Sequence, residues 1–286
     1  MKRGLLILTL VTVTLTAGAQ GRQGLPSKPN FDPFLRSQWY LGFKGGMNLT
    51  NPQVINSYSS IEPLNYPAAD LEKTYDGMRH PGGQAALVIT YYTKGFSISF
   101  EPGFMSNIFE HNTSTTWQDS ENISNSLNVD YNHRTRLDYL EFPVTVKYDL
   151  LRGNIRPFVG AGATYGLLMN ASRKITRSGE DSASGYTGPF TDASLTVGIK
   201  DQFIKSSVSA KGFAGVSYDP GNIRLILDIG YQFGLNNITS TKNRYSENIL
   251  SGIGESMDDL KLGLFTTNLS VVFPLKFIGK NFSSFN

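Results

Sequence analysis

Acid–base chemistry in this 286-residue chain would fall to its three histidines, His80, His111 and His133. Either of the last two, with a serine and with Glu121 or Asp130, could form the catalytic triad of a hydrolase. No spacing selects such a triad, and all three histidines fall in polar segments of the chain. We therefore expect solvated loop histidines, and a hydrolase at the rim of the fold is a minor alternative.

Metal and phosphate sites have little support among the other polar residues. Because the chain has no cysteine and no His-x-x-x-His pair, a zinc site has no ligand set. Residues 160–162 read Gly-Ala-Gly, but they lie inside an apolar alternating segment with no helix pattern behind it, so they do not indicate a dinucleotide loop. Asp258, Asp259 and Glu255 could hold a divalent cation, although a solvated turn is the preferred interpretation. We expect no cofactor and no metal.

A larger set of charged residues shares one property. Each lies on the polar face of a segment in which apolar and polar residues alternate. The set is Lys44, Glu101, Glu141, Lys147, Arg156, Lys211, Arg224, Asp228 and Lys276. What these side chains can do depends on the elements that carry them.

Eight alternating segments run along the chain, and their period of two predicts β-strands. In the third segment, Phe and Ile alternate with Ser and Glu, which is typical of a strand with one face toward lipid. The segments cover residues 39–49, 84–92, 96–104, 137–148, 155–168, 204–218, 223–235 and 265–277.

The connections between these segments are alternately short and long. Residues 93–95 and the sequence Asp-Pro-Gly-Asn at 219–222 are tight turns. The long, polar connections are 50–83, 105–136, 169–203 and 236–261. This rhythm predicts an all-β fold, an eight-stranded antiparallel up-and-down transmembrane β-barrel with short periplasmic turns and long external loops.

A barrel of eight strands is only wide enough for its own side chains. We therefore expect the charged set to pair across the lumen, where removal of one partner would leave the other buried and unpaired. A narrow ion or small-solute pore through this network is the alternative. A soluble lipocalin-like barrel, with its apolar face inward, would instead leave Lys44, Glu101, Glu141, Arg224 and Asp228 outside.

The two ends of the chain are expected to lie outside the barrel. Lys2 and Arg3 precede an apolar run and the sequence Ala-Gly-Ala at 17–19, which predicts a signal peptide over residues 1–19. Residues 20–38 contain three prolines and are expected to form a periplasmic lead-in. The barrel then covers residues 39–277, and 278–286 form a periplasmic tail.

Composition agrees with an exported chain. The formal charge is +3, and +1 once Lys2 and Arg3 are removed, which gives no electrostatic case for a nucleic-acid partner. The absence of cysteine means that an exported fold must hold without disulfides, which a closed hydrogen-bonded barrel can do.

Residues 137–148 read LDYLEFPVTVKY, and residues 155–162 read IRPFVGAG. This pair of segments resembles the LEIP-x-x-x-KY and RPYVGAG pattern of Bacteroidetes outer-membrane β-barrel proteins, the porin or PorT-like family. The resemblance extends over about residues 39–277 and implies an outer-membrane barrel. It carries no catalytic motif, and one member of that family, PorT, is implicated in protein secretion and gliding.

These observations together favour a non-enzymatic barrel in the bacterial outer membrane. We expect a monomer in contact with outer-membrane lipid, acting as a scaffold or binding a partner through its external loops. An accessory role in a secretion or uptake complex, through the periplasmic face, is the alternative.

Overall fold

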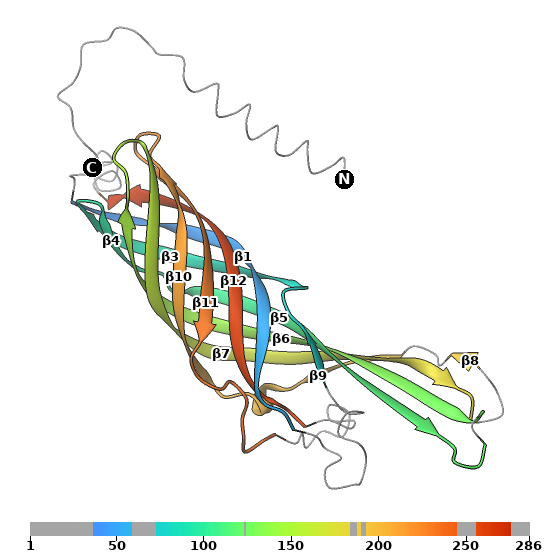
Figure 1. Cartoon of the computed structure of the whole chain (residues 1–286). Helices are drawn as coiled ribbons and strands as arrows, with labels where there is room; N and C mark the ends of the chain where they lie inside the picture. Colours follow the sequence, from blue (N-terminus) through green and yellow to red (C-terminus); the bar gives the residue numbers. More distant parts are fainter. Residues whose placement is uncertain are drawn as a thin grey trace, which may run out of the picture. The chain divides into compact units, whose positions relative to one another are not determined.

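The fold is all-β (Figure 1). The computed structural model describes residues 37–58, 73–122, 124–183, 188–189, 193–244 and 256–275. All of them belong to one compact unit, residues 33–286. Among these residues no helix is long and apolar enough to cross a bilayer. The signal peptide, the residues of the lead-in before Ser37 and the C-terminal tail lie outside the described residues.

Eight strand positions form a closed antiparallel ring. β4 and β5 share one position, because both pair with β3 on one side and with β6 on the other. Pairing of β1 with β12 closes the ring. Around the ring the strands are β1 (Gln38–Asn56), β3 (Pro81–Thr93), β4 (Phe96–Phe100) with β5 (Gly103–Gln118), β6 (Ser126–Asp149), β7 (Ile155–Asp181), β10 (Ser206–Tyr218), β11 (Arg224–Gly234) and β12 (Asp259–Pro274). The predicted fold class is confirmed.

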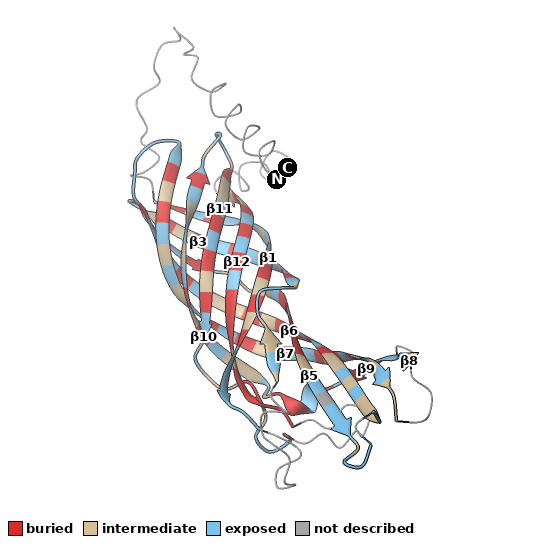
Figure 2. Cartoon of the chain, turned by 45° about the vertical axis from the view of Figure 1, so that its right-hand side comes forward, coloured by how far each residue is buried: buried red, intermediate tan, exposed pale blue. Residues whose placement is uncertain are grey.

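The strands alternate between an apolar outer face and a polar inner face. Figure 2 shows buried and exposed residues alternating along the barrel strands. On the outside, Phe43, Leu227 and Leu269 are 66%, 54% and 55% exposed, although each is a large apolar side chain. On the inside, Asp228 and Arg156 are buried. An apolar exterior around buried charges is the inverse of a soluble barrel and suits a lipid environment.

The short turns and both described chain ends lie at one end of the barrel, the short-turn end. Lys94 and Gly95 join β3 to β4, and Asp219 begins the turn between β10 and β11. At the same end, Tyr40 near the start of β1 pairs with Pro274 at the end of β12.

Two of the four connections predicted as long loops, 105–136 and 169–203, are strand over much of their length. Residues 105–118 and 126–136 continue β5 and β6 as a regular hairpin, with pairing as far as Gln118 opposite Ser126. β7 likewise continues to Asp181. Three short elements lie beside these strands: β2 (Thr74–Asp76) on β5, and β8 (Gly188–Pro189) and β9 (Ala193–Gly198) on β7.

We call the part of β5, β6 and β7 that lies beyond the barrel wall the projecting sheet, residues 106–118, 126–138 and 170–181. It begins where β5 leaves β3 at Met105 and β7 leaves β10 at Leu167. Figure 1 shows these three strands running on past the other strands of the ring.

An apolar core occupies the root of the projecting sheet. It collects residues from β5, β6, β7, β9 and β12, residues next to η3 (Lys200–Gln202), and two residues of the connection between β11 and β12. We call this set the outer core: Phe109, Leu137, Tyr139, Leu168, Ala171, Ile175, Val197, Ile199, Phe203, Ile238, Met257, Leu260 and Leu262. The polar connections therefore fold around a hydrophobic centre of their own.

Candidate functional site

A cluster of charges lies midway along the lumen. Lys44 on β1 points inward because its neighbours Phe43 and Gly45 face outward, and its Nζ lies 2.9 Å from Glu101 Oε2. The same Nζ is 3.6 Å from Asp228 Oδ2 on β11. Asn268 on β12 donates from Nδ2 to Asp228 Oδ1 at 2.7 Å. The Lys44 ammonium group thus pairs with two carboxylates, and the Asn268 amide gives the Asp228 carboxylate one more hydrogen bond.

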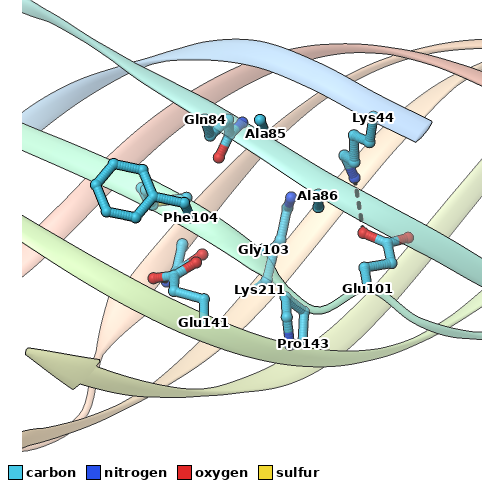
Figure 3. Close-up of a pocket in the computed structure, with 12 residues that line it drawn as sticks. Lys44, Gln84, Ala85, Ala86, Glu101, Gly103, Phe104, Glu141, Pro143 and Lys211 are labelled. Carbon is cyan, nitrogen blue, oxygen red and sulfur yellow. Dashed lines mark hydrogen bonds and ion pairs between the residues drawn. The ribbon is translucent and has the colours of Figure 1, made fainter. Parts of the chain in front are cut away.

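A small cavity lies beside this cluster (Figure 3). Lys211, Glu141 and Gln232 line it together with Lys44 and Glu101. Gln232 donates from Nε2 to Glu141 Oε1 at 3.3 Å. The cavity holds about 30 Å³, which is the space of about two water molecules. Side chains from several strands therefore meet at this level of the lumen.

A second charged cluster fills the short-turn end. Arg156 Nε lies 3.0 Å from Asp149 Oδ2, and Arg156 also pairs with Asp219. Arg224 donates to both oxygens of Asp219, at 2.7 and 3.0 Å. The Arg224 guanidinium stands 4.5 Å from the ring centres of Tyr40 and Tyr92. Asp219 belongs to the turn between β10 and β11, so these arginines fasten that turn across the end of the lumen.

The nine charges predicted as one network thus divide into two groups. Lys44, Glu101, Glu141, Lys211 and Asp228 belong to the middle cluster, and Lys147, Arg156 and Arg224 to the short-turn cluster. Lys276 lies outside the described residues. Asp149 and Asp219, which complete the second cluster, were missed. Both stand at strand ends, where alternation no longer tells an inward side chain from an outward one.

The outer end is held by buried aspartates. Asp258 accepts hydrogen bonds from Lys73 Nζ and Tyr75 Oη, each at 2.8 Å. Asp259 accepts from Arg244 at 2.8 Å, from Asn237 at 2.9 Å and from Asn56 at 3.1 Å. We call these two aspartates and their partners the clasp.

Burial opposes ionisation of Asp259, but the bonds from Asn56, Arg244 and Asn237 outweigh it and hold its pKa below the ordinary value. The solvated turn predicted for Asp258 and Asp259 is therefore wrong, because both are buried and each carboxylate already has a cationic partner. Glu255 lies outside the described residues. Within the described ranges no group of three or more His, Cys, Asp or Glu side chains could hold a metal ion.

His111 and His133 are not loop residues. They face each other across β5 and β6, with ring centres 4.6 Å apart and planes 4° from parallel, and both are buried. Tyr75 and Tyr131 pack near them. The prediction of solvated loop histidines is wrong for this pair, because the hairpin continues into the segment read as a loop.

The imagined triad does not assemble from these residues. Asp130 accepts a hydrogen bond from Ser114 at 2.6 Å on one face of the hairpin. His111 and His133 differ from these two by odd numbers of residues, which places them on the opposite face. His80 contacts Glu110 at 2.7 Å, and Glu110 also pairs with Arg134. Burial opposes ionisation of Glu110, but His80 and Arg134 outweigh it and keep its pKa below the ordinary value.

Among the described residues, the projecting sheet is the largest feature outside the barrel. On one of its faces lie Asn112, Ser114, Thr116 and Asp130, all polar. A groove of about 760 Å³ runs along this face and the edge of β5. The other face carries Trp117, which is 46% exposed, and its cross-strand partner Leu127. The sheet therefore offers one polar and one partly apolar surface.

Comparison with known proteins adds a family and several distant structures. A family model described as "Outer membrane protein beta-barrel domain" matches residues 19–240. No curated protein sequence matches the chain. Among solved structures, Neisserial surface protein A (NspA) is 10% identical, with 82% of this chain and 96% of that chain covered and a TM-score of 0.34. Ail of Yersinia pestis, solved with the heparin analogue sucrose octasulfate, is 10% identical, with coverage of 82% and 99% and a TM-score of 0.30.

Proposed function

This chain belongs to the outer membrane protein beta-barrel domain family, and from that premise we propose that it is a non-enzymatic surface-binding protein that acts through the projecting sheet. It is a protein of the bacterial outer membrane. We also infer membership of the Bacteroidetes PorT-like branch, for which the segments 137–148 and 155–162 are the support.

The proposal rests on the contrast between the lumen, which charged side chains occupy, and the three strands that extend beyond the barrel wall. The lumen is filled at its middle by the Lys44 cluster and at the short-turn end by the Arg156 and Arg224 cluster. In contrast, β5, β6 and β7 each continue more than ten residues beyond the barrel wall. A regular, hydrogen-bonded sheet held on an anchored barrel is a rigid platform for recognition.

The outer core and the clasp keep that platform in place. Phe109, Leu137 and Ile175 on the three projecting strands pack into the same cluster as Leu260 and Leu262 on β12. Lys73 and Tyr75 at β2 bind Asp258 next to β12. The sheet is thus braced against the opposite wall of the barrel, which lowers the entropy that binding would otherwise lose.

Photocrosslinking in intact cells tests the proposal. A photoreactive amino acid would replace Ser178, on the polar face of the projecting sheet, in otherwise unchanged protein in its native membrane. Matched variants would carry it at Asn154, in a short turn, and at Ile229, which is 51% exposed on the lipid-facing surface. We expect adducts with a partner protein, which protease removes, at Ser178. At Ile229 we expect adducts with lipid and none with protein. Protein adducts at Asn154 with none at Ser178 would contradict surface binding and favour an accessory role at the periplasmic face.

A further inference from the structure

One edge of the projecting sheet is open over part of its length in the described part of the chain. β5 pairs with β6 on one side along its whole length. On its other side β3 covers Gly103–Met105 and β2 covers Glu110–Asn112. Beyond Asn112, no strand among the described residues pairs with this side of β5.

β2, the strand that covers part of this edge, begins at Thr74. Thr74 of β2 pairs with Asn112, so one more residue of β2 would place Lys73 beside Thr113. Lys73 instead donates from Nζ to Asp258 Oδ1 at 2.8 Å and to the Tyr58 carbonyl oxygen at 2.9 Å. Lys73 thus belongs to the clasp and lies outside β2, and Ser114 and Thr116 on the following part of β5 are exposed.

The direction of the β5 amides follows from the hydrogen bonds at its two ends. Asp119 N donates to Asn125 O across the hairpin, and Glu101 N donates to Pro143 O on β6, both at 3.0 Å. Successive amides in a strand point to opposite sides, so the odd-numbered residues face β6. The even-numbered residues, among them Ser114 and Thr116, therefore direct their N–H and C=O groups toward the open side.

The sequence of this edge lacks the usual protection. Proteins blunt exposed edge strands with lysine, proline or bulges, which prevent another chain from pairing with them. Residues 112–118 read NTSTTWQ, with no charge and no proline, and the pairing of β5 with β6 shows no bulge. The groove of about 760 Å³ includes Thr74 at the end of β2 and then Asn112, Ser114 and Thr116 along β5. The open position is thus in line with an existing strand.

We propose that this edge, Thr113–Gln118 of β5, binds an extended segment of a partner protein as an added β-strand. The inference deepens the proposed function and rests on it. Main-chain hydrogen bonds to Ser114 and Thr116 supply the affinity, and side chains supply the selectivity. Alternate residues of the segment lie next to Ser114 and Thr116, which favours polar groups, and the others lie next to Trp117, which favours apolar ones.

A second copy of this chain is a poorer occupant. Two copies in one membrane share one orientation, so their β5 strands could pair only in parallel, which is slightly less stable for each residue. A separate segment can run antiparallel to β5, as β2 does.

Displayed peptides on the intact protein provide the test. Full-length protein in lipid nanodiscs is used to select from a random library of twelve-residue peptides, and the tightest binder is synthesised. We expect alternating apolar and uncharged polar residues in it, and protection of the Ser114 and Thr116 amides from hydrogen exchange when it binds. Thr116→Pro removes one edge donor without touching the β6 pairing, and we expect at least a tenfold loss of affinity. The matched control, Thr116→Ser, keeps both the amide and the hydroxyl group, and we expect its affinity to stay within about twofold of wild type.

Each contrary result overturns the edge site. One such result is that the peptide binds equally well to a Thr116→Pro variant that still shows the heat-dependent gel mobility shift of a folded barrel. Another is that the library yields no binder. Protection of the Thr116 amide without any peptide would mean that the chain covers its own edge. If Thr116→Pro does not fold, the test is whether the peptide protects the Ser114 and Thr116 amides of the wild-type protein from hydrogen exchange, and no protection would overturn the edge site. Because the chain has no cysteine, rapid disulfide dimerisation of Thr116→Cys in membranes would assign the edge to a second copy. Ser178 adducts in cells alongside any of these results would leave surface binding intact.

Discussion

Lys44 and Glu101 form an ion pair of 2.9 Å inside the barrel, with Asp228 only 3.6 Å from the same ammonium group. Lys44→Met would leave two carboxylates together without their shared cation. We expect the free energy of unfolding to fall by about 3–5 kcal/mol, as when one partner of a buried pair is removed. Urea titration of the protein in detergent micelles measures this.

The same triad predicts an order among variants. Glu101→Gln should cost less than Lys44→Met, because Asp228 still pairs with Lys44. Met47→Leu, on the lipid-facing side of the same strand, should change stability by less than about 1 kcal/mol. If Lys44→Met were as stable as Met47→Leu, the middle cluster would not contribute to stability.

Two glycines in adjacent strands should respond in opposite ways to alanine. A Cβ at Gly162 on β7 would meet the Val144 carbonyl oxygen and lie 2.8 Å from Thr145 Cγ2. A Cβ at Gly212 on β10 would meet nothing within 4 Å. We expect Gly162→Ala to destabilise by about 1–3 kcal/mol, and Gly212→Ala to be neutral or slightly stabilising. The same urea titrations compare them, and similar losses for both would contradict the close approach of β6 and β7.

The sequence was a good guide to the barrel because lipid imposes a strict rule. Most outward residues are apolar, so alternation marks every spanning segment, and all eight predicted segments overlap a strand position of the ring. The inward direction of Lys44 and Asp228 follows from the same parity. That these interior charges close the lumen to ions stays a prediction.

Outside the membrane that rule no longer applies. The segment 112–118 is polar except for Trp117 and shows no regular alternation, so its continuation of β5 was not predictable from the sequence pattern. Its strand structure comes from pairing with β6 across a hairpin. Burial of His111 and His133 depends on that pairing and on Tyr75 from β2, contacts that no local pattern records.

Acid should loosen the clasp. The pKa of Asp259 lies below its ordinary value of 3.8, despite burial, because Asn56, Arg244 and Asn237 bind its ionised form. A lowered pKa in the folded state means that this stabilisation is complete above the ordinary value and is lost as the pH falls through the folded value. We therefore expect hydrogen exchange at residues 237–244 to be constant from pH 7 to about 4, after correction for intrinsic rates, and to accelerate below that.

Asp259→Asn is the matched control for acid loosening, because it cannot ionise and keeps nearly the same shape. It should show the loosened clasp at neutral pH and little further change in acid. A wild-type profile that stayed flat down to pH 2 would mean that Asp259 does not hold residues 237–244.

Bilayer recording distinguishes a filled barrel from a pore. The lumen contains the middle cluster around Lys44 and the short-turn cluster around Asp219, and these are separate obstacles in series. We expect purified protein in planar bilayers to give no stable conductance steps. Lys44→Ser combined with Glu101→Ser widens only the middle, so it should stay silent because Arg156 and Arg224 still bind Asp219 across the end. Asp219→Ala in the same background releases both arginines, and we expect brief, flickering openings. Large, steady steps from the wild-type protein would instead mean that ions pass these clusters, and would favour the narrow pore over surface binding as the role of this barrel.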